Sequence, residues 1–135
     1  MMMDSSGKST RTALVVDDDP AVLGLLTEIL VEDGYITTSF PRGRPALDAL
    51  AQQPYDVLVV DVGLPDMNGM RICQEARQQY GDDIVIFIIT GDQQRERVVT
   101  AFEIGADDFI SKPFDIDELL ARIAVKLRRT TDIRG

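Results

Sequence analysis

Short apolar runs alternate along the chain with longer stretches in which apolar residues recur at helical spacing. The apolar runs occupy residues 13–16, 57–60, 84–89 and, more briefly, 109–110. A further segment, residues 35–40, is more polar and is bounded by Gly34 and Pro41. Continuous apolar runs of this length indicate strands that are covered on both faces, and the more polar segment indicates an edge strand.

The stretches between these runs have the apolar spacing of amphipathic helices. The first predicted helix follows Asp19 as its N-cap, has Pro20 in its first turn and ends before Gly34. Its expected inward residues are Val22, Leu25, Leu26, Ile29 and Leu30. The last predicted helix has as its expected inward residues Ile116, Leu119, Leu120, Ile123 and Leu127. The other helices are predicted over residues 45–52, 69–79 and about 93–104.

Strands and helices in strict alternation predict an α/β fold, in which helices cover both faces of a parallel sheet. Five strands and five helices fit a doubly wound five-stranded parallel sheet of order 2-1-3-4-5, the flavodoxin-like (βα)5 arrangement. We predict one domain over residues 11–129, a disordered N-terminal tail over residues 1–10, and a C-terminal tail or linker stub over residues 130–135. Ligands of such sheets bind beyond the carboxyl ends of the strands, where the winding reverses between strands 1 and 3.

Composition narrows the class of protein further. The chain is 44% hydrophobic and 27% charged, which is typical of a globular domain in water. It has no apolar stretch of about 20 residues and no apolar segment near its start, so we expect a cytoplasmic protein without membrane association. The net charge of −9 argues against binding of nucleic acid by this domain. The single cysteine, Cys73, is interpreted as a small buried hydrophobic residue.

Side chains that can bind a metal ion or take part in a reaction stand where the predicted strands end. Strand 1 runs into Asp17 and Asp18, strand 3 into Asp61 and strand 4 into Thr90, and strand 5 is followed by Lys112. If strands 1 and 3 are neighbours, the three carboxylates converge, and their proton affinities rise unless a cation lies between them. An oxygen-only donor set suits Mg²⁺, and a chain with no histidine and one cysteine argues against zinc.

Isolated acidic or amide residues have a more ordinary interpretation. A single Asp after a strand usually caps a helix or forms a turn. Asp66 and Asn68 are therefore interpreted as loop formers.

Four segments in order carry a resemblance to a known family: LVVDDDP, DVGLPDMNG, IIT and GADDFISKPF. Together they resemble the receiver domain of bacterial two-component response regulators, in the CheY-like superfamily, over about residues 11–129. The resemblance implies a phosphoacceptor signalling module rather than an enzyme, with self-catalysed phosphorylation and autodephosphorylation. It also implies a sensor histidine kinase or a His-phosphotransfer protein as partner, and the phosphorylated histidine must come from outside this sequence.

The family's metal and phosphoryl-acceptor positions match residue by residue. Asp61 matches the phosphoacceptor, and Asp18 matches the direct Mg²⁺ ligand. Asp17 matches the acid that acts largely through metal-bound water. Gly63 falls where the family supplies a backbone carbonyl to the metal.

Other matched positions imply phosphoryl binding and switching. Lys112 matches the lysine that pairs with phosphoryl oxygens, and the following Pro113 matches a proline whose peptide bond is cis in the family. Thr90 matches the hydroxyl that binds the phosphoryl group. Phe109 matches the aromatic residue that rotates when Thr90 moves, although an ordinary core role for this ring stays open. Asp92 stands where the family tunes hydrolysis of the acyl phosphate.

Residues 102–129 are most similar to receivers joined to winged-helix DNA-binding domains. The resemblance implies an output face made by the fourth helix, the fifth strand and the fifth helix, with the candidate residues Val98, Asp107, Asp108, Glu118 and Arg122. Its partner would be an output domain or a second copy in a phosphorylation-dependent homodimer. Glu118 and Arg122 are expected to form an exposed i,i+4 pair. Val98 replaces an arginine expected there, which either makes this face more apolar or reflects local packing.

Three alternative functions stay open at this point. One is an interaction module with this fold that needs no phosphorylation, although the complete set of Asp17, Asp18, Asp61, Thr90 and Lys112 argues against it. Another is a phosphatase with an aspartyl-phosphate intermediate, but such enzymes usually place a second acid where this chain has Gly63. A third is a flavin-binding electron carrier, which needs a Ser/Thr/Gly-rich phosphate-binding loop after strand 1. This chain has an acidic loop there, residues 17–20, which would repel a phosphate.

Overall fold

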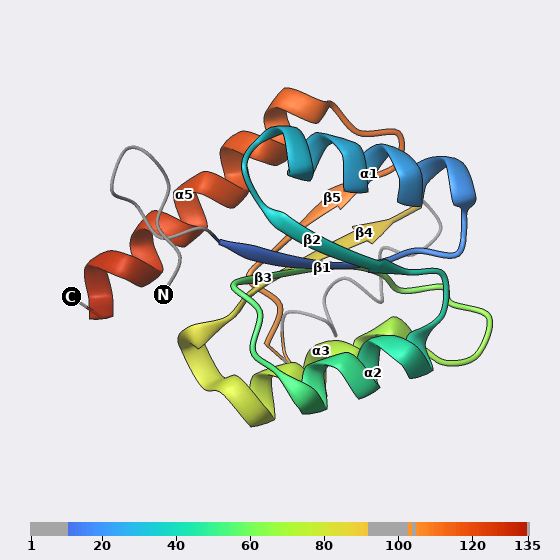
Figure 1. Ribbon diagram of the computed structural model, residues 1–135, viewed down its shortest axis with the longest axis horizontal. Coiled ribbons are helices and arrows are strands. Elements are labelled where there is room, and N and C mark those ends of the chain that lie inside the picture. The colour runs from blue at the N-terminus through green and yellow to red at the C-terminus, as the bar shows by residue number, and fades with distance from the viewer. Residues whose placement is uncertain (1–10, 92–102, 104, 135) are drawn as a thin grey trace.

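The computed structural model describes residues 11–91, 103 and 105–134, and the side chains among these as far as Arg128. The elements are β1 (Thr12–Val16), α1 (Pro20–Glu32), β2 (Ile36–Phe40), α2 (Gly43–Gln52), β3 (Val57–Asp61), α3 (Gly69–Tyr80), η1 (Gly81–Asp83), β4 (Val85–Thr90), β5 (Asp108–Ser111) and α5 (Ile116–Arg134). The strands form one parallel sheet of order β2-β1-β3-β4-β5, which confirms the predicted doubly wound arrangement (Figure 1). The helix predicted over residues 93–104 lies, apart from Glu103, outside the described residues.

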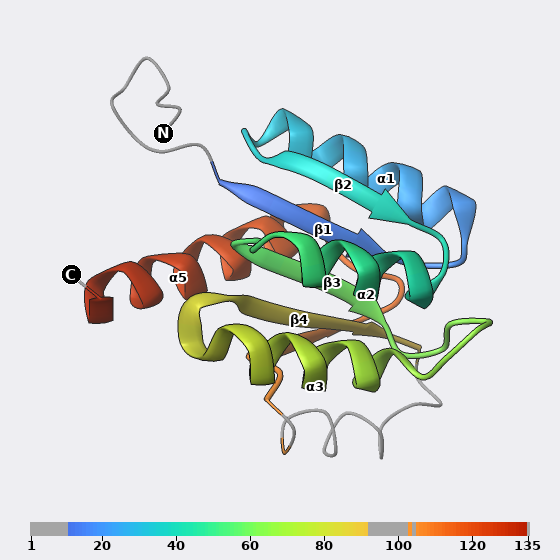
Figure 2. The same cartoon turned by 60° about the horizontal axis from the view of Figure 1, so that its bottom comes forward.

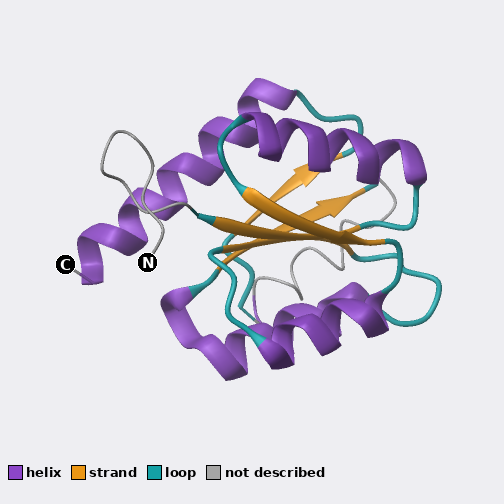
Figure 3. Cartoon of the chain, in the orientation of Figure 1, coloured by secondary structure: helices purple, strands orange, loops and turns teal. Residues whose placement is uncertain are grey.

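The sheet is the middle of three layers, with α1 and α5 on one face and α2 and α3 on the other (Figures 1 and 3). Alternate strand residues point to opposite faces. Those facing α2 and α3 include Leu14, Val16, Leu58, Val60, Ile86 and Ile88. Those facing α1 and α5 include Ala13, Val15, Val57, Val59, Val85 and Phe87. Both sets are buried, which explains why the central strands are continuous apolar runs in the sequence.

Helix α1 begins and ends where the sequence predicts. The side chain of Asp19 accepts hydrogen bonds from the backbone amides of Ala21 and Val22, at 2.9 and 3.4 Å. Gly34 has a φ of 97°, the left-handed conformation that commonly follows a helix. The prediction for Leu25 was wrong, because this side chain is 38% exposed. Successive residues turn by about 100° around a helix, so Leu25 lies at the margin of a face centred on the fully buried Leu26.

Helix α2 begins at Gly43, two residues before the predicted start at Pro45. The residue at its N-cap, Arg42, makes no capping hydrogen bond with its side chain. The carboxylate of Asp66 caps the helix instead, because it accepts hydrogen bonds from the amides of Gly43 and Arg44. The two extra residues at the start of the helix therefore depend on a residue that is distant in sequence.

Helix α5 is the longest described element, and its backbone continues through Arg134. Residues 130–134, which we assigned to a tail or linker stub, thus continue this helix; the division of the chain into domain and tails stays a prediction. Neither α5 nor any other helix in the described part of the chain combines the length and apolarity needed to cross a membrane.

Candidate functional site

The carboxyl ends of the parallel strands lie at one edge of the sheet, where the loop between β3 and α3 projects (Figure 2). Asp17 follows β1 directly, and Asp61 is the last residue of β3, the strand paired with β1. One carboxylate oxygen from each of Asp17, Asp18 and Asp61 lies within 4.8 Å of the others. The structure therefore brings together the three acids that the sequence places at neighbouring strand ends.

Asp17 is the buried member of this acidic cluster, at 1% exposure. Its Oδ1 accepts a hydrogen bond from the backbone amide of Asp19 at 2.9 Å. Its Oδ2 accepts no hydrogen bond of normal geometry among the described residues, although Lys112 Nζ lies 3.0 Å away. Burial raises the pKa of Asp17, the Asp19 amide and the Lys112 ammonium lower it, and the charge of Asp61 raises it further. The positive charge of Lys112 therefore offsets part of the cost of burying this carboxylate.

Lys112 supplies the positive charge of the site. Its Nζ lies 3.0 Å from Asp17 Oδ2 and donates a hydrogen bond to Asp61 Oδ2 at 3.1 Å. Burial opposes the charge of this ammonium, but its contacts with Asp17 and Asp61 outweigh burial and raise the pKa of Lys112. The Lys112–Pro113 peptide bond is cis, as the resemblance implies, and the Lys112 amide donates to the carbonyl of Thr90 at 2.8 Å.

The loop that follows Asp61 folds back tightly on the site. The amide of Gly63 donates to Asp61 Oδ1 at 3.1 Å, and the amide of Gly69 donates to the carbonyl of Val62 at 2.8 Å. A Cβ at position 69 would lie 2.1 Å from the carbonyl oxygen of Asp61. Only glycine allows this close approach of α3 to the end of β3.

The donor set of this site fits a hard divalent cation such as Mg²⁺. It offers three carboxylates, of which Asp17 is buried, Asp61 half-buried and Asp18 exposed. Oxygen-only ligands with room for water are what Mg²⁺ prefers in proteins. Among the residues that the structure describes, the three carboxylates share the single ammonium of Lys112, and the buried Asp17 Oδ2 accepts no hydrogen bond of normal geometry, so the cluster has negative charge left for a cation to neutralise.

Thr90 is the last residue of β4, and Phe109 is the second residue of the neighbouring strand β5. Thr90 is 2% exposed, and its hydroxyl donates to the carbonyl of Gly91 at 3.2 Å. The ring of Phe109 is partly buried and packs against the core cluster on the α2 and α3 side of the sheet. Asp92 and Val98 lie outside the described residues.

Three of the predicted output-face residues form one connected cluster between β5 and α5. Arg122 Nη2 donates to Glu118 Oε1 at 2.6 Å, which confirms the expected i,i+4 pair. Arg122 Nη1 donates to the Phe109 carbonyl at 3.1 Å and lies 3.5 Å from Asp108 Oδ1. Whether these residues contact a partner stays a prediction.

Asp107 contacts α3 instead of this cluster. Its Oδ2 accepts hydrogen bonds from Arg77 Nη2 and from the backbone amide of Ile86, both at 2.7 Å. Arg77 was not singled out from the sequence, and nothing in its local pattern distinguishes it from other arginines on exposed helix faces. The output role of Asp107 stays a prediction, beside the intramolecular contact that the structure gives it.

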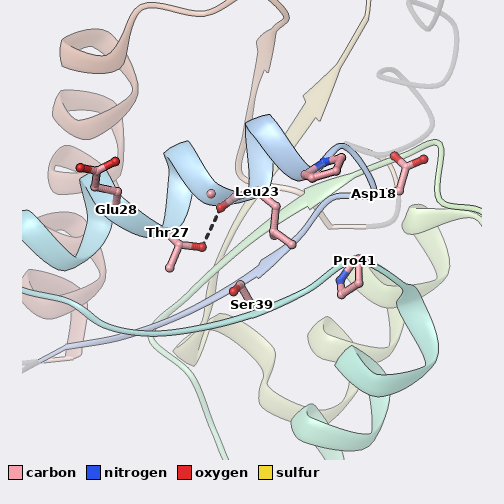
Figure 4. Close-up of a pocket in the computed structure, with 8 residues that line it drawn as sticks. Asp18, Leu23, Thr27, Glu28, Ser39 and Pro41 are labelled. Atoms are coloured by element: carbon pink, nitrogen blue, oxygen red, sulfur yellow. Dashed lines mark hydrogen bonds between the residues drawn. The ribbon is translucent and has the colours of Figure 1, made fainter.

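A groove of about 550 Å³ lies between α1 and β2, beside the acidic cluster (Figure 4). It shares with the cluster only Asp18, and its remaining lining residues are Pro20, Leu23, Gly24, Thr27, Glu28, Ser39 and Pro41. The Thr27 hydroxyl donates to the carbonyl of Leu23 at 2.7 Å, so it offers the groove an acceptor but not a donor. The acidic cluster therefore lies at the rim of this groove, with Asp18 as the residue they share.

Comparison with known proteins identifies the class to which this fold and this acidic cluster belong. Residues 13–124 match the family described as the response regulator receiver domain, and the chain belongs to that family. It is 42% identical over 122 residues to the response regulator MprA of Mycolicibacterium vanbaalenii, a match that covers 90% of this chain and 52% of that protein. It is 41% identical over 117 residues to the response regulator MprA of Mycobacterium avium, a match that covers 87% of this chain and 51% of that protein. The chain thus spans about half the length of the curated relatives it matches.

Solved structures agree with this assignment. A CheY-like receiver domain protein from Methanospirillum hungatei has a TM-score of 0.87 at 28% identity, covering 94% of this chain and all of that one. The BeF3-activated DrrB receiver domain has a TM-score of 0.80 at 32% identity, covering 89% of this chain and 99% of that one. Full-length FixJ from B. japonicum has a TM-score of 0.81 at 31% identity, covering 91% of this chain and 60% of that one. The chain is a receiver domain, a module of phosphorylation signalling, and receiver domains bind Mg²⁺ at an acidic cluster of this kind.

Proposed function

We propose that this receiver accepts a phosphoryl group on Asp61 in a Mg²⁺-dependent reaction. The observation that carries the proposal is the convergence of three carboxylates within 4.8 Å, with one lysine contacting two of them. The residues that would hold Mg²⁺ are Asp17, Asp18, Asp61 and the backbone carbonyl of Gly63. When bound there, Mg²⁺ would neutralise negative charge that gathers on the transferring oxygens.

Asp61 is the nucleophile of the proposed reaction. One of its carboxylate oxygens forms a bond to phosphorus while the bond from phosphorus to a partner's imidazole nitrogen breaks. The Gly63 amide, 3.1 Å from Asp61 Oδ1, and Lys112, 3.1 Å from Asp61 Oδ2, orient the carboxylate before the attack. Lys112 then pairs with the phosphoryl oxygens, and attack of water on the acyl phosphate later restores the Asp61 carboxylate.

The proposed partner is a sensor histidine kinase or a His-phosphotransfer protein, and the exchange takes place in the cytoplasm, where such kinases use ATP. A small phosphodonor replaces the partner in vitro. The absence of histidine from this sequence is consistent with a donor on another domain or another molecule.

Phosphorylation would be read out through Thr90 and Phe109. The added charge and acceptor oxygens attract the Thr90 hydroxyl, and Phe109 rotates into the vacated space. Phe109 is directly connected to the Arg122 cluster through its backbone carbonyl, so a shift of β5 reaches α5. The proposed output-face residues are Val98, Asp107, Asp108, Glu118 and Arg122, and the reader is an output domain or a second copy of the chain.

Incubation with acetyl phosphate, followed by intact mass measurement, tests the proposal. We expect the wild type to gain one phosphoryl group with Mg²⁺ and none when Mg²⁺ is chelated, and Asp61→Asn to gain none. Asp82→Asn is the matched control, because Asp82 is an exposed acid in η1, at the opposite end of the sheet. A wild type that stays unmodified at excess Mg²⁺ and donor contradicts the proposal.

A further inference from the structure

The loop between β3 and α3 is attached at its middle to the start of α2. Asp66 Oδ1 accepts a hydrogen bond from the amide of Gly43 at 2.8 Å, and Asp66 Oδ2 accepts one from the amide of Arg44 at 2.9 Å. The two bonds join residues 23 and 22 positions apart in the chain. Hydrogen bonds from Gly43 and Arg44 lower the pKa of Asp66, which therefore stays a carboxylate at neutral pH.

A second contact strengthens this attachment. A Cβ at Gly43 would lie 2.5 Å from Cγ of Met67, so the Met67 side chain lies directly over the first residue of α2. Met67 also packs against the core cluster on that face of the sheet. The attachment therefore combines two hydrogen bonds with an apolar contact.

The rest of the loop transmits this attachment to the acidic cluster. Gly63 and Asn68 form an antiparallel bridge across the loop, and the Asn68 side chain accepts a hydrogen bond from the Met70 amide, which fixes the start of α3. Asp66 stands between the two bridged residues. A loop closed in this way moves largely as one body, so the position of residue 66 affects that of Gly63.

We propose that Asp66 is a positioning residue, whose contact with α2 holds the Gly63 carbonyl where the Mg²⁺ site requires it. The inference rests on the proposed function, because it assigns Asp66 a role toward the same cation. Without these two hydrogen bonds, the middle of the loop is held to α2 only by the apolar contact of Met67, and the loop samples orientations in which Gly63 is not a ligand. Apparent affinity then falls by the fraction of molecules in the competent orientation.

The expected effect of Asp66→Ala is a three- to tenfold rise in the apparent Kd for Mg²⁺. This is smaller than the roughly ten- to hundredfold effect of removing a direct partner of a metal ligand, because Asp66 acts through the loop. Phosphorylation by acetyl phosphate should be slower at subsaturating Mg²⁺ and return to the wild-type rate at saturating Mg²⁺. Asp66→Asn keeps one acceptor oxygen and should fall between the wild type and Asp66→Ala.

A second variant distinguishes a role of Asp66 in positioning the loop from a role in capping α2. Arg42 is at the N-cap of α2, has an extended backbone and gives no side-chain cap, so Arg42→Ser supplies a local cap there. In the double variant Asp66→Ala with Arg42→Ser, the helix is capped but the loop is not attached. We expect the double variant to recover thermal stability without recovering Mg²⁺ affinity. Arg42→Ser alone and Asp48→Ala, which removes an exposed charge from α2, are the controls.

Two measurements on the full chain decide the matter: calorimetric titration with Mg²⁺ alone, and hydrogen exchange of the Gly43 and Arg44 amides without metal. Faster exchange at both amides in Asp66→Ala, together with weaker Mg²⁺ binding, supports the proposal. Faster exchange with wild-type Mg²⁺ affinity overturns it. Recovery of affinity in the double variant also overturns it, since Asp66 would then be only a cap. A wild type that binds no Mg²⁺ refutes the proposed function itself, and the positioning role with it.

Discussion

Replacement of Arg77 by methionine would remove a guanidinium that connects α3 to the residues just before β4 and just before β5. Arg77 Nε and Nη2 donate to the carbonyl of Gly105 at 2.9 and 2.6 Å, and Nη1 donates to the carbonyl of Ile84 at 2.9 Å. Nη2 also pairs with Asp107 Oδ2 at 2.7 Å. A Cβ at Gly105 would lie 2.8 Å from Arg77 Cγ, so the aliphatic part of Arg77 is packed as well. Methionine keeps that packing and removes only the polar contacts.

The structure sets the size of the expected loss. The Arg77 side chain is 18% exposed and that of Asp107 34% exposed, so the pair is neither fully buried nor a surface ion pair. A hydrogen bond to a charged group contributes about 1.5–3 kcal/mol, and breaking a fully buried pair costs about 3–5 kcal/mol. Asp107 keeps its hydrogen bond from the Ile86 amide in the variant. We therefore expect Arg77→Met to lower the free energy of unfolding by about 2–4 kcal/mol.

Urea denaturation followed by circular dichroism measures this loss, and a double-mutant cycle with Asp107→Asn isolates the pair. We expect a coupling energy of about 1–2 kcal/mol between positions 77 and 107. A loss below about 0.5 kcal/mol for Arg77→Met, or no coupling, would refute this account of the network. If Asp107→Asn leaves stability unchanged but weakens association of the phosphorylated form, then its predicted output role outweighs the intramolecular one.

Three further predictions concern stability. Gly24→Ala should raise the free energy of unfolding by about 0.4–1 kcal/mol in urea denaturation, because Gly24 is inside α1 and an added Cβ meets nothing within 4 Å. Gly69→Ala should lower it by more than about 2 kcal/mol, since its Cβ would lie 2.1 Å from the Asp61 carbonyl; an unchanged midpoint would contradict that contact. Burial raises the pKa of the Cys73 thiol from 9.0 to about 12, so the folded state holds this proton more tightly than the unfolded state does. Burial of the neutral thiol therefore stabilises the fold fully below pH 9, and this stabilisation is lost as the pH rises from 9 toward 12. Between pH 9 and pH 10 the wild type should therefore lose about 1 kcal/mol more than Cys73→Ala, and equal losses would show an accessible thiol.

The fold could be predicted from the sequence because its strands are covered on both faces. Continuous apolar runs and capped amphipathic helices specify the order of elements, and general rules for parallel sheets then limit the strand order. The acidic cluster follows from the same rules, because the carboxyl ends of β1 and β3 lie side by side. Periodicity alone misplaced Leu25, since it assigns residues at the margin of a helix face less reliably than those at its centre.

The residues that could not be predicted act through contacts between segments distant in sequence. Asp66 has the local signature of a turn former, and its bonds to the start of α2 depend on how the loop folds over that helix. Arg77 has the local signature of a helix surface residue, yet its guanidinium reaches the chain 28 and 30 positions further on. Neither partner is adjacent in sequence or implied by a periodic pattern.

The most direct test of the central claim is to locate the phosphoryl group chemically. The receiver is treated with acetyl phosphate in the presence and absence of Mg²⁺, reduced with borohydride, which converts an aspartyl phosphate into homoserine, and digested for peptide mass spectrometry. We predict homoserine at position 61, only in samples that contained Mg²⁺. Modification at another acid, or equal modification of Asp61 without Mg²⁺, would contradict the claim that the acidic cluster and its cation make Asp61 the acceptor.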